Sequence, residues 1–417
     1  MIQKIENYLR VKIRRYTRLK SFIKTIYQAF FYVLSDKKKV TGNIVRVSPN
    51  DEFEYFFGYY DKSPWDITDR FILCLRVENA CNSPAPDKPA EIIMIDTHDN
   101  NSYCVVAKTY AWNSQMGCRV QWLGPDFNSR IIYNDFRDGN LCSVILDINS
   151  KNEKIIDSPV YDVSANGAFA LTLDFVRLHR LRPGYGYSNL REKDKSQIPN
   201  EACIYKVDLI KNEIKPILSY SDLYKFENRS DMTGADHKVN HIMINPNGKR
   251  FMMLHRWISS NGEKYTRLVT ADSDGNNLYN QLDDDFTSHM CWKNDNQILA
   301  FANKAKHGEG YFLLTDKSEE YELMLPTLIT DGHPSYSPDG LKIVTDTYPN
   351  RSRKQALYLN IVGENTVKNI GMVFSPFKYT GDVRCDLHPR WNRHSDRICF
   401  DGTFEGKRRL YIFNDLL

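Results

Sequence analysis

Short apolar runs, each coming after a tight-turn sequence, recur along most of the chain. FILCL comes after Asp-Ile-Thr-Asp, RIIYND after Gly-Pro-Asp, and AFALTL after Ser-Ala-Asn-Gly. Runs of four to eight residues between turns predict β-strands, because a helix needs a longer segment with apolar residues every three or four positions. The 25 Tyr and 21 Phe residues also favour strands.

The second half of the chain repeats one longer pattern four times. A histidine comes first, an apolar or aromatic residue follows three positions later, and a turn and a short apolar run complete each copy. The histidines are His241, His289, His333 and His388, and the steps between them are 48, 44 and 55 residues. A repeat of this length is typical of the blades of a β-propeller.

Seven such units can be counted, and they start near residues 62, 119, 160, 241, 289, 333 and 388. The last unit reaches the C-terminus one outer strand short, and a strand from about 43–57 would close the ring. Closure of the ring by such a strand is the usual solution for this architecture. We therefore predict an all-β fold, a seven-bladed β-propeller over residues 43–417 preceded by an N-terminal amphipathic α-helix and linker in 1–42. An open all-β solenoid is the alternative.

The N-terminal segment differs from the rest in charge and in period. Residues 1–40 carry eleven Lys and Arg against two acids, so the rest of the chain is mildly acidic although the whole has a net charge of +4. In 1–34 an apolar residue recurs every three or four positions, which predicts a basic amphipathic helix. Such a helix can lie on an anionic membrane surface or dock on the protein's own body or a partner. Its apolar stretch is too short to span a bilayer, and the acidic body does not favour nucleic-acid binding.

The nine cysteines form no C-x-x-C pair and mostly sit inside apolar runs. This usage indicates reduced, buried thiols and hence a cytoplasmic protein, peripheral on the inner face of the membrane if the helix binds lipid. The expected oligomeric state is a monomer or an oligomer of unspecified size.

Propeller geometry places the repeated histidines together. The first strand of each blade lines the axis and the second returns beside it, so the four histidines should share one end of the axis. Lys62 and Arg119 hold the corresponding positions of two upstream blades. Candidate substrate-binding residues on the same face are His255 at the end of a second strand and Arg177, Arg180, Arg182 and Tyr185 in the insertion 175–200.

Converging imidazoles can bind a divalent transition metal and leave a coordination position open for chemistry. The other interpretation is structural: a histidine at a blade entrance bonds a nearby Asp and holds the blade in place, which suits Gly332-His333. Four histidines in one register favour the metal or catalytic site.

The blades HPSYSPDG, DLHPRWNRHSDRICFDGTFEG and the segment SHMCW resemble those of the oligogalacturonate lyase-like, TolB-like propellers, over roughly residues 55–417. The resemblance implies a seven-bladed propeller that binds a divalent metal, Mn or similar, through several histidines and a glutamine, and that cleaves uronate-containing acidic oligosaccharides by β-elimination. Carried over, it makes His289, His333 and His388 metal ligands and His241 the catalytic base. No glutamine lies close to His388, where Arg384 and Asp386 stand instead; we take Arg384 as a substrate ligand.

In this mechanism the metal, Lys62 or Arg119 would offset the uronate charge while a neutral histidine takes the C5 proton. Two other functions stay open. One is a membrane-associated role in surface-polysaccharide biosynthesis without lyase chemistry, which a basic tail would suit. The other is a protein-binding propeller in which the histidines are structural.

Overall fold

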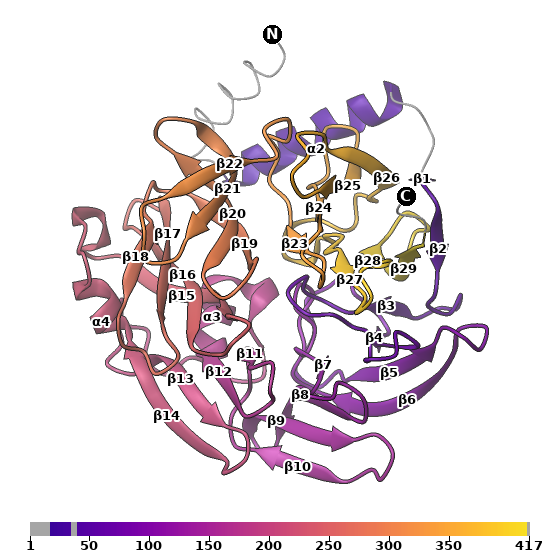
Figure 1. The fold of residues 1–417 in the computed structure, drawn as a ribbon, viewed down its shortest axis with the longest axis horizontal. Coiled ribbons are helices and arrows are strands. Elements are labelled where there is room, and N and C mark those ends of the chain that lie inside the picture. Colours follow the sequence, from indigo (N-terminus) through magenta and orange to yellow (C-terminus); the bar gives the residue numbers. More distant parts are fainter. Residues whose placement is uncertain (1–16, 35–39, 415–417) are drawn as a thin grey trace.

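The computed structural model describes residues 17–34 and 40–414, and it confirms the predicted seven-bladed β-propeller (Figure 1). Seven antiparallel sheets surround one axis, and the chain runs from the innermost strand outward in blades one to five. Blades six and seven do the same, except that each takes its outermost strand from the N-terminal part of the chain. The predicted N-terminal helix is present as α2 (Thr17–Leu34), and it lies against the propeller. The part of the expected amphipathic helix that falls in residues 1–16 lies outside the described residues.

The first three blades contain the following strands. Blade one has β3 (Glu54–Phe56), β4 (Phe71–Val77), β5 (Ala90–Asp96) and β6 (Ser102–Thr109); blade two has β7 (Gln121–Trp122), β8 (Arg130–Arg137), β9 (Asn140–Asp147) and β10 (Glu153–Ile156). Blade three has β11 (Asp162–Val163), β12 (Phe169–Leu173), β13 (Ala202–Asp208) and β14 (Glu213–Ser219). The insertion between β12 and β13 carries a short helix, α3 (Phe175–Leu181), and α4 (Tyr220–Lys225) follows β14.

The histidine-bearing blades are four to seven. Blade four has β15 (Asp236–Ile244), β16 (Arg250–Ile258), β17 (Lys264–Asp272) and β18 (Tyr279–Leu282); blade five has β19 (Thr287–Trp292), β20 (Gln297–Lys304), β21 (Gly308–Thr315) and β22 (Tyr321–Met324). Blade six has β23 (Ser335–Tyr336), β24 (Lys342–Asp346), β25 (Lys354–Ile361) and β26 (Lys368–Phe374), with β1 (Val40–Thr41) on its outer edge. Blade seven has β27 (Arg390–Trp391), β28 (Ile398–Gly402), β29 (Arg409–Phe413) and β2 (Ile44–Arg46).

The ring is closed by chain from before the first blade. Strand β2 pairs antiparallel with β29, in a register that sets Ile44 opposite Phe413. The next few residues open blade one as β3, so residues 43–57 serve two blades. Asp401 of β28 joins these blades: its carboxylate accepts hydrogen bonds from the amides of Phe57 and Gly58 and pairs with buried Arg390.

Apolar side chains of neighbouring sheets fill the space between blades. Leu357 of β25 and Phe400 of β28, for example, are fully buried in one cluster between blades six and seven. All nine cysteines are unpaired thiols, and six of them are buried. Among the helices of the described residues, none has the length and apolar character needed to cross a lipid bilayer.

Candidate metal site and anion-binding cluster

The four repeated histidines meet at the axis, as their register predicts. Neighbouring ring centres are 5.7 Å apart for His241 and His289, 4.1 Å for His289 and His333, and 4.3 Å for His333 and His388. Each side chain is buried, with 2% or less of the residue exposed. The fold therefore concentrates four imidazoles that are shielded from bulk water.

Local backbone irregularities aim these side chains at the axis. His241 and His289 each lie where the register between the first and second strands shifts, in β15 and β19. His241 and His388 have positive φ values of 54° and 46°, a region that residues with a side chain rarely adopt. Bulges and strained residues are common beside functional sites because they turn a side chain away from the regular ladder.

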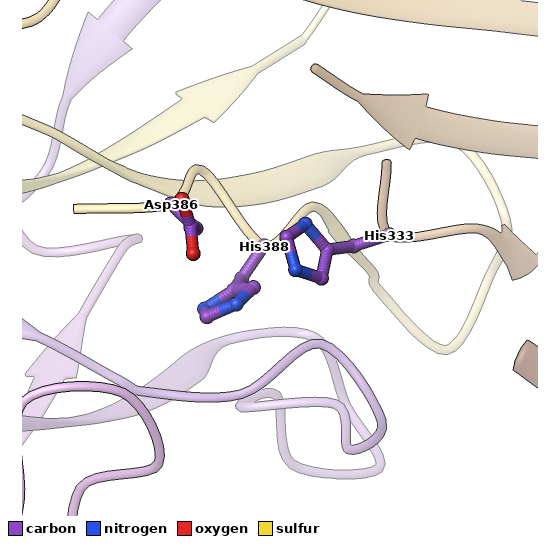
Figure 2. Close-up of side chains that lie close together, drawn as sticks. All are labelled: His333, Asp386 and His388. Carbon is purple, nitrogen blue, oxygen red and sulfur yellow. The ribbon is translucent and has the colours of Figure 1, made fainter. Parts of the chain in front are cut away.

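Three side chains form the best metal-binding group. Ligand atoms of His333, Asp386 and His388 all lie within 4.8 Å of one another, and all three residues are buried. Figure 2 shows that the two rings and the carboxylate point toward a shared space. Imidazole nitrogen and carboxylate oxygen together suit Mn, Fe, Zn and similar divalent ions.

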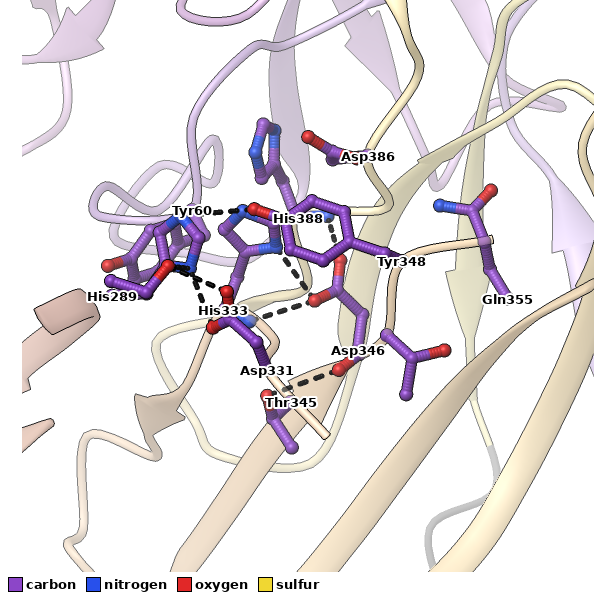
Figure 3. A network of polar contacts seen from close by, with 12 residues as sticks. Tyr60, His289, Asp331, His333, Thr345, Asp346, Tyr348, Gln355, Asp386 and His388 are labelled. Carbon is purple, nitrogen blue, oxygen red and sulfur yellow. Dashed lines mark hydrogen bonds and ion pairs between the residues drawn. The ribbon is translucent and has the colours of Figure 1, made fainter. Parts of the chain in front are cut away.

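Hydrogen bonds fix which nitrogen of each ring is available. The Nδ1 of His388 lies 2.6 Å from the carbonyl oxygen of Gly58, which can only accept, so this nitrogen carries the proton. The Nδ1 of His333 lies 2.7 Å from a carboxylate oxygen of Asp346 (Figure 3). The Nε2 atoms of both rings are buried and have no hydrogen-bond partner. When the ring is neutral and its proton is on Nδ1, the Nε2 lone pair is available to a metal ion, and this arrangement of outer partners is usual for histidine ligands.

Asp346 and Gly58 hold the two histidines of this group in position. The Asp346 carboxylate also accepts hydrogen bonds from the backbone amides of His333 (2.8 Å) and His388 (3.0 Å), so one side chain places both ligands. Gly58 has a φ of +123°, and a Cβ at this position would lie 2.6 Å from the carbonyl carbon of Met116. Only glycine can present its carbonyl to His388 at this point.

The charges of the three groups suit a cation. Burial, together with the positive charge of neighbouring His333, holds the pKa of His388 well below its usual value, so its ring is neutral. Burial raises the pKa of Asp386, but the bidentate pair with Arg384, at 2.6 and 2.7 Å, outweighs it and lowers that pKa. Burial lowers the pKa of His333, and the Asp346 carboxylate more than reverses this. Near neutral pH Asp386 is therefore an ionised ligand and His388 an unprotonated one.

His289 and His241 stand beside the trio and are held differently. The Nδ1 of His289 contacts Asp331 at 3.1 Å and Ser288 at 3.0 Å, and its Nε2 lies 3.5 Å from the Tyr348 hydroxyl. Burial lowers the pKa of His289 to about 4. The Nδ1 of His241 lies 2.6 Å from the hydroxyl of Tyr59, whose ring stacks on it. His289, expected as a ligand, thus lies outside the group of three.

Several cations gather next to the histidines. Arg182 lies 3.8 Å from the ring centre of Tyr185, and Arg384 lies 4.4 Å from that of Tyr348. Burial and the charge of Arg182 lower the pKa of Arg256 to about 10. Buried nitrogens of Arg182 (Nη1) and Arg256 (Nε) have no hydrogen-bond partner. Unpartnered guanidinium nitrogens beside one another favour a bound carboxylate or phosphate.

Two expected catalytic cations lie elsewhere. Lys62 forms an ion pair with Asp162 and lines a cavity of about 330 Å³ that extends to the turns following the inner strands. Arg119 donates two hydrogen bonds to Asp61, at 2.9 and 2.6 Å, and one to the Tyr161 carbonyl at 2.7 Å. The structure uses both residues in contacts between blades and does not bring them into the histidine cluster.

Only some of the other expected substrate ligands lie beside the histidines. Arg182, Tyr185 and Arg384 belong to the cation cluster described above. Arg177 and Arg180, which were expected to bind substrate, both form ion pairs with Glu192 of the same insertion. His255 lies 2.9 Å from His237 and 3.1 Å from Arg267, in a separate buried group of blade four.

The site also contains residues that the repeat does not reveal. Asp386 stands two positions before His388, and this D-x-H spacing was the available signal. Tyr59 and Tyr60 enter from the irregular inner segment of blade one, and Arg256 follows His255 at the end of β16. None of these three belongs to the histidine pattern.

No protein-family model and no curated protein sequence matches the chain. Solved structures do match it. An oligogalacturonate lyase from Vibrio parahaemolyticus is 12% identical, with a TM-score of 0.61, and the match covers 91% of this chain and 94% of that one. An oligogalacturonate lyase in complex with manganese is 14% identical, with a TM-score of 0.65, and the match covers 91% of this chain and 95% of that one. TolB from Acinetobacter baumannii matches over 73% of this chain with a TM-score of 0.42. At these identities the first two likenesses show a shared propeller fold, which confirms the resemblance in fold.

Proposed function

We propose that this propeller is a divalent-metal-dependent lyase that cleaves an acidic, uronate-containing oligosaccharide by β-elimination. The observation that carries the proposal is the pair of buried, unpartnered Nε2 atoms of His333 and His388 beside the Asp386 carboxylate. These residues fit a divalent ion such as Mn²⁺, and a similar fold in the comparison holds manganese. A metal bound there would act as a Lewis acid that stabilises charge on the uronate carboxylate as the C5 proton leaves.

The neighbouring cations suit the anionic substrate. Arg182 and Arg256 offer unpartnered nitrogens, and Arg384 lies between Asp386 and the ring of Tyr348. A uronate carboxylate placed here would receive charge-assisted hydrogen bonds, which are about twice as strong as neutral ones. It would also replace the water that burial has removed from these guanidinium groups.

His241 is the proposed base. Its pKa is held well below the usual value, first by burial and then by the charges of Arg256 and Arg182. A bound carboxylate offsets those two charges, so substrate binding raises the basicity of the ring that must accept the proton. His241 takes the C5 proton, the C–H electron pair forms the C4–C5 double bond, and the C4–O bond breaks, with the leaving oxygen taking up a proton. Tyr59, 2.6 Å from Nδ1, orients the ring.

The test is the appearance of the unsaturated product. Purified protein is incubated with a panel of uronide oligosaccharides and Mn²⁺, and the absorbance of the new double bond is followed. We expect His241→Ala to lower kcat by about 10²–10⁴-fold while metal content stays at the wild-type level. His394→Ala is the matched control, since this histidine is largely exposed and contacts Asp69, away from the histidine cluster. If no uronide gives the product with the wild-type protein and Mn²⁺, the lyase proposal fails.

A further inference from the structure

Helix α2 has two apolar faces, and the propeller covers only one of them. On the covered face Gln28 donates a hydrogen bond to the Asn350 carbonyl at 2.9 Å, Tyr32 stacks on Phe374 with ring centres 4.7 Å apart, and Arg351 lies over Phe31. Residues 27, 28, 31 and 32 are buried or half-buried by these contacts. The helix is therefore seated on blade six through its aromatic side.

The opposite face, here called the outer row, is exposed and apolar. It consists of Ile26, Ala29, Phe30, Val33 and Leu34, which recur at helical spacing and are all apolar, and the exposed polar residue Thr25 lies at its N-terminal end. Ile26, Phe30, Val33 and Leu34 are 55%, 59%, 67% and 66% exposed. A helix that is apolar on both faces is expected between two apolar surroundings, and the propeller supplies only one.

The seat of α2 is on the end of blade six that carries the histidines. Asn350 and Arg351 belong to the loop between β24 and β25, and β24 ends at Asp346, which holds His333 and His388. Phe374 ends β26, where it pairs with Lys354 at the start of β25. Arg353 joins the two loops through hydrogen bonds to Ser375, Pro376 and Tyr379. Figure 1 shows α2 lying across this blade.

We propose that the outer row binds the surface of an anionic lipid bilayer and holds the histidine-bearing end of blade six toward the headgroups. The charge of the N-terminal segment favours an anionic bilayer as the partner, because residues 1–40 carry eleven Lys and Arg and only two acids. Each basic residue near an anionic surface adds about fivefold to binding. A second copy of the chain would instead bring the same cations against each other. This inference stands independently of the lyase chemistry.

The experiment is vesicle co-sedimentation of the full chain. One set of vesicles contains equal parts of phosphatidylcholine and phosphatidylglycerol, and the other contains phosphatidylcholine alone. We expect binding to the anionic vesicles, weaker binding as salt is raised, and little binding to the neutral ones. Phe30→Glu/Leu34→Glu should lower the partition coefficient about tenfold or more, because two apolar side chains then carry charge at the interface.

The matched control is Ile210→Glu/Leu341→Glu. These two residues are 72% and 61% exposed and lie in the turns at the other end of blades three and six, so the change in charge is the same. The control should bind nearly as well as the wild type, and both double variants should unfold at the wild-type temperature. The proposal is overturned if the wild type binds neither vesicle, or if the control loses as much binding as Phe30→Glu/Leu34→Glu. It is also overturned if light scattering shows a dimer that only the α2 variant disperses, since the outer row then pairs two copies.

Discussion

Replacing the carboxylate of the His333, Asp386 and His388 group should remove most of the stabilisation that a bound metal gives. At a Mn²⁺ concentration 100 times the dissociation constant, binding adds about 2.7 kcal/mol to the free energy of unfolding. An unfolding entropy of about 2.1 cal/mol/K per residue gives about 0.9 kcal/mol/K for 417 residues. The wild type should therefore gain about 3 °C in Tm on adding Mn²⁺, and chelation should reverse the gain.

Asp386→Asn keeps the shape of the side chain and removes its charge. A metal affinity lowered about 100-fold would leave about 0.4 kcal/mol of stabilisation at the same Mn²⁺ concentration, or under about 1 °C. Asp331→Asn is the matched control, because Asp331 bonds Ser288 and His289 but lies outside the group of three. Differential scanning calorimetry measures the shifts, and titration calorimetry measures affinity directly. The reasoning is refuted if Asp386→Asn retains the full shift, or if Asp331→Asn loses as much of it.

Two further predictions concern stability. Burial lowers the pKa of Lys238 to about 6. Between that pH and about 10.5 the unfolded chain binds a proton that the folded chain does not, so this residue makes the free energy of unfolding rise with pH. Lys238→Met should therefore add about 3–5 kcal/mol to the free energy of unfolding at pH 7 and flatten its rise with pH, as measured by urea unfolding. A gain that is equal at pH 7 and pH 10 would contradict this. Asp401→Ala leaves buried Arg390 unpaired where blade seven meets blade one, and should lower the free energy of unfolding by about 3–5 kcal/mol; a loss below about 1 kcal/mol, typical of surface pairs, would contradict it.

The histidine register was predictable because a propeller repeats the position of each inner strand about one axis. Residues at equivalent places in successive blades therefore converge whatever lies between them, and His241, His289, His333 and His388 do so. Blade count and ring closure follow from the same spacing. The repeat could not reveal Tyr59, since it comes from an irregular segment that no other blade copies.

The other site residues could not be predicted as well, because their positions depend on which side chains they pair with. Arg177 and Arg180 have the right chemistry for an anionic substrate, but Glu192 lies 15 and 12 residues further along the same insertion and pairs with both. Arg119 is likewise bound to Asp61. The sequence gives residue type and the approximate end of a blade, whereas the direction of a long side chain depends on which opposite charge the folded loops bring nearest.

Whether the blade-entrance histidines hold a metal or only hold the blades depends on the second nitrogen of each ring. His394 shows the structural case: its Nδ1 contacts Asp69 at 2.5 Å, and 67% of its side chain is exposed, so water can satisfy the other nitrogen. His333 makes the same kind of contact with Asp346, yet its Nε2 is buried without a partner, and so is that of His388. An unsatisfied buried polar group costs about 1–3 kcal/mol. Two such atoms beside one ionised carboxylate support the proposed metal site, because a role in pinning the blades does not require them.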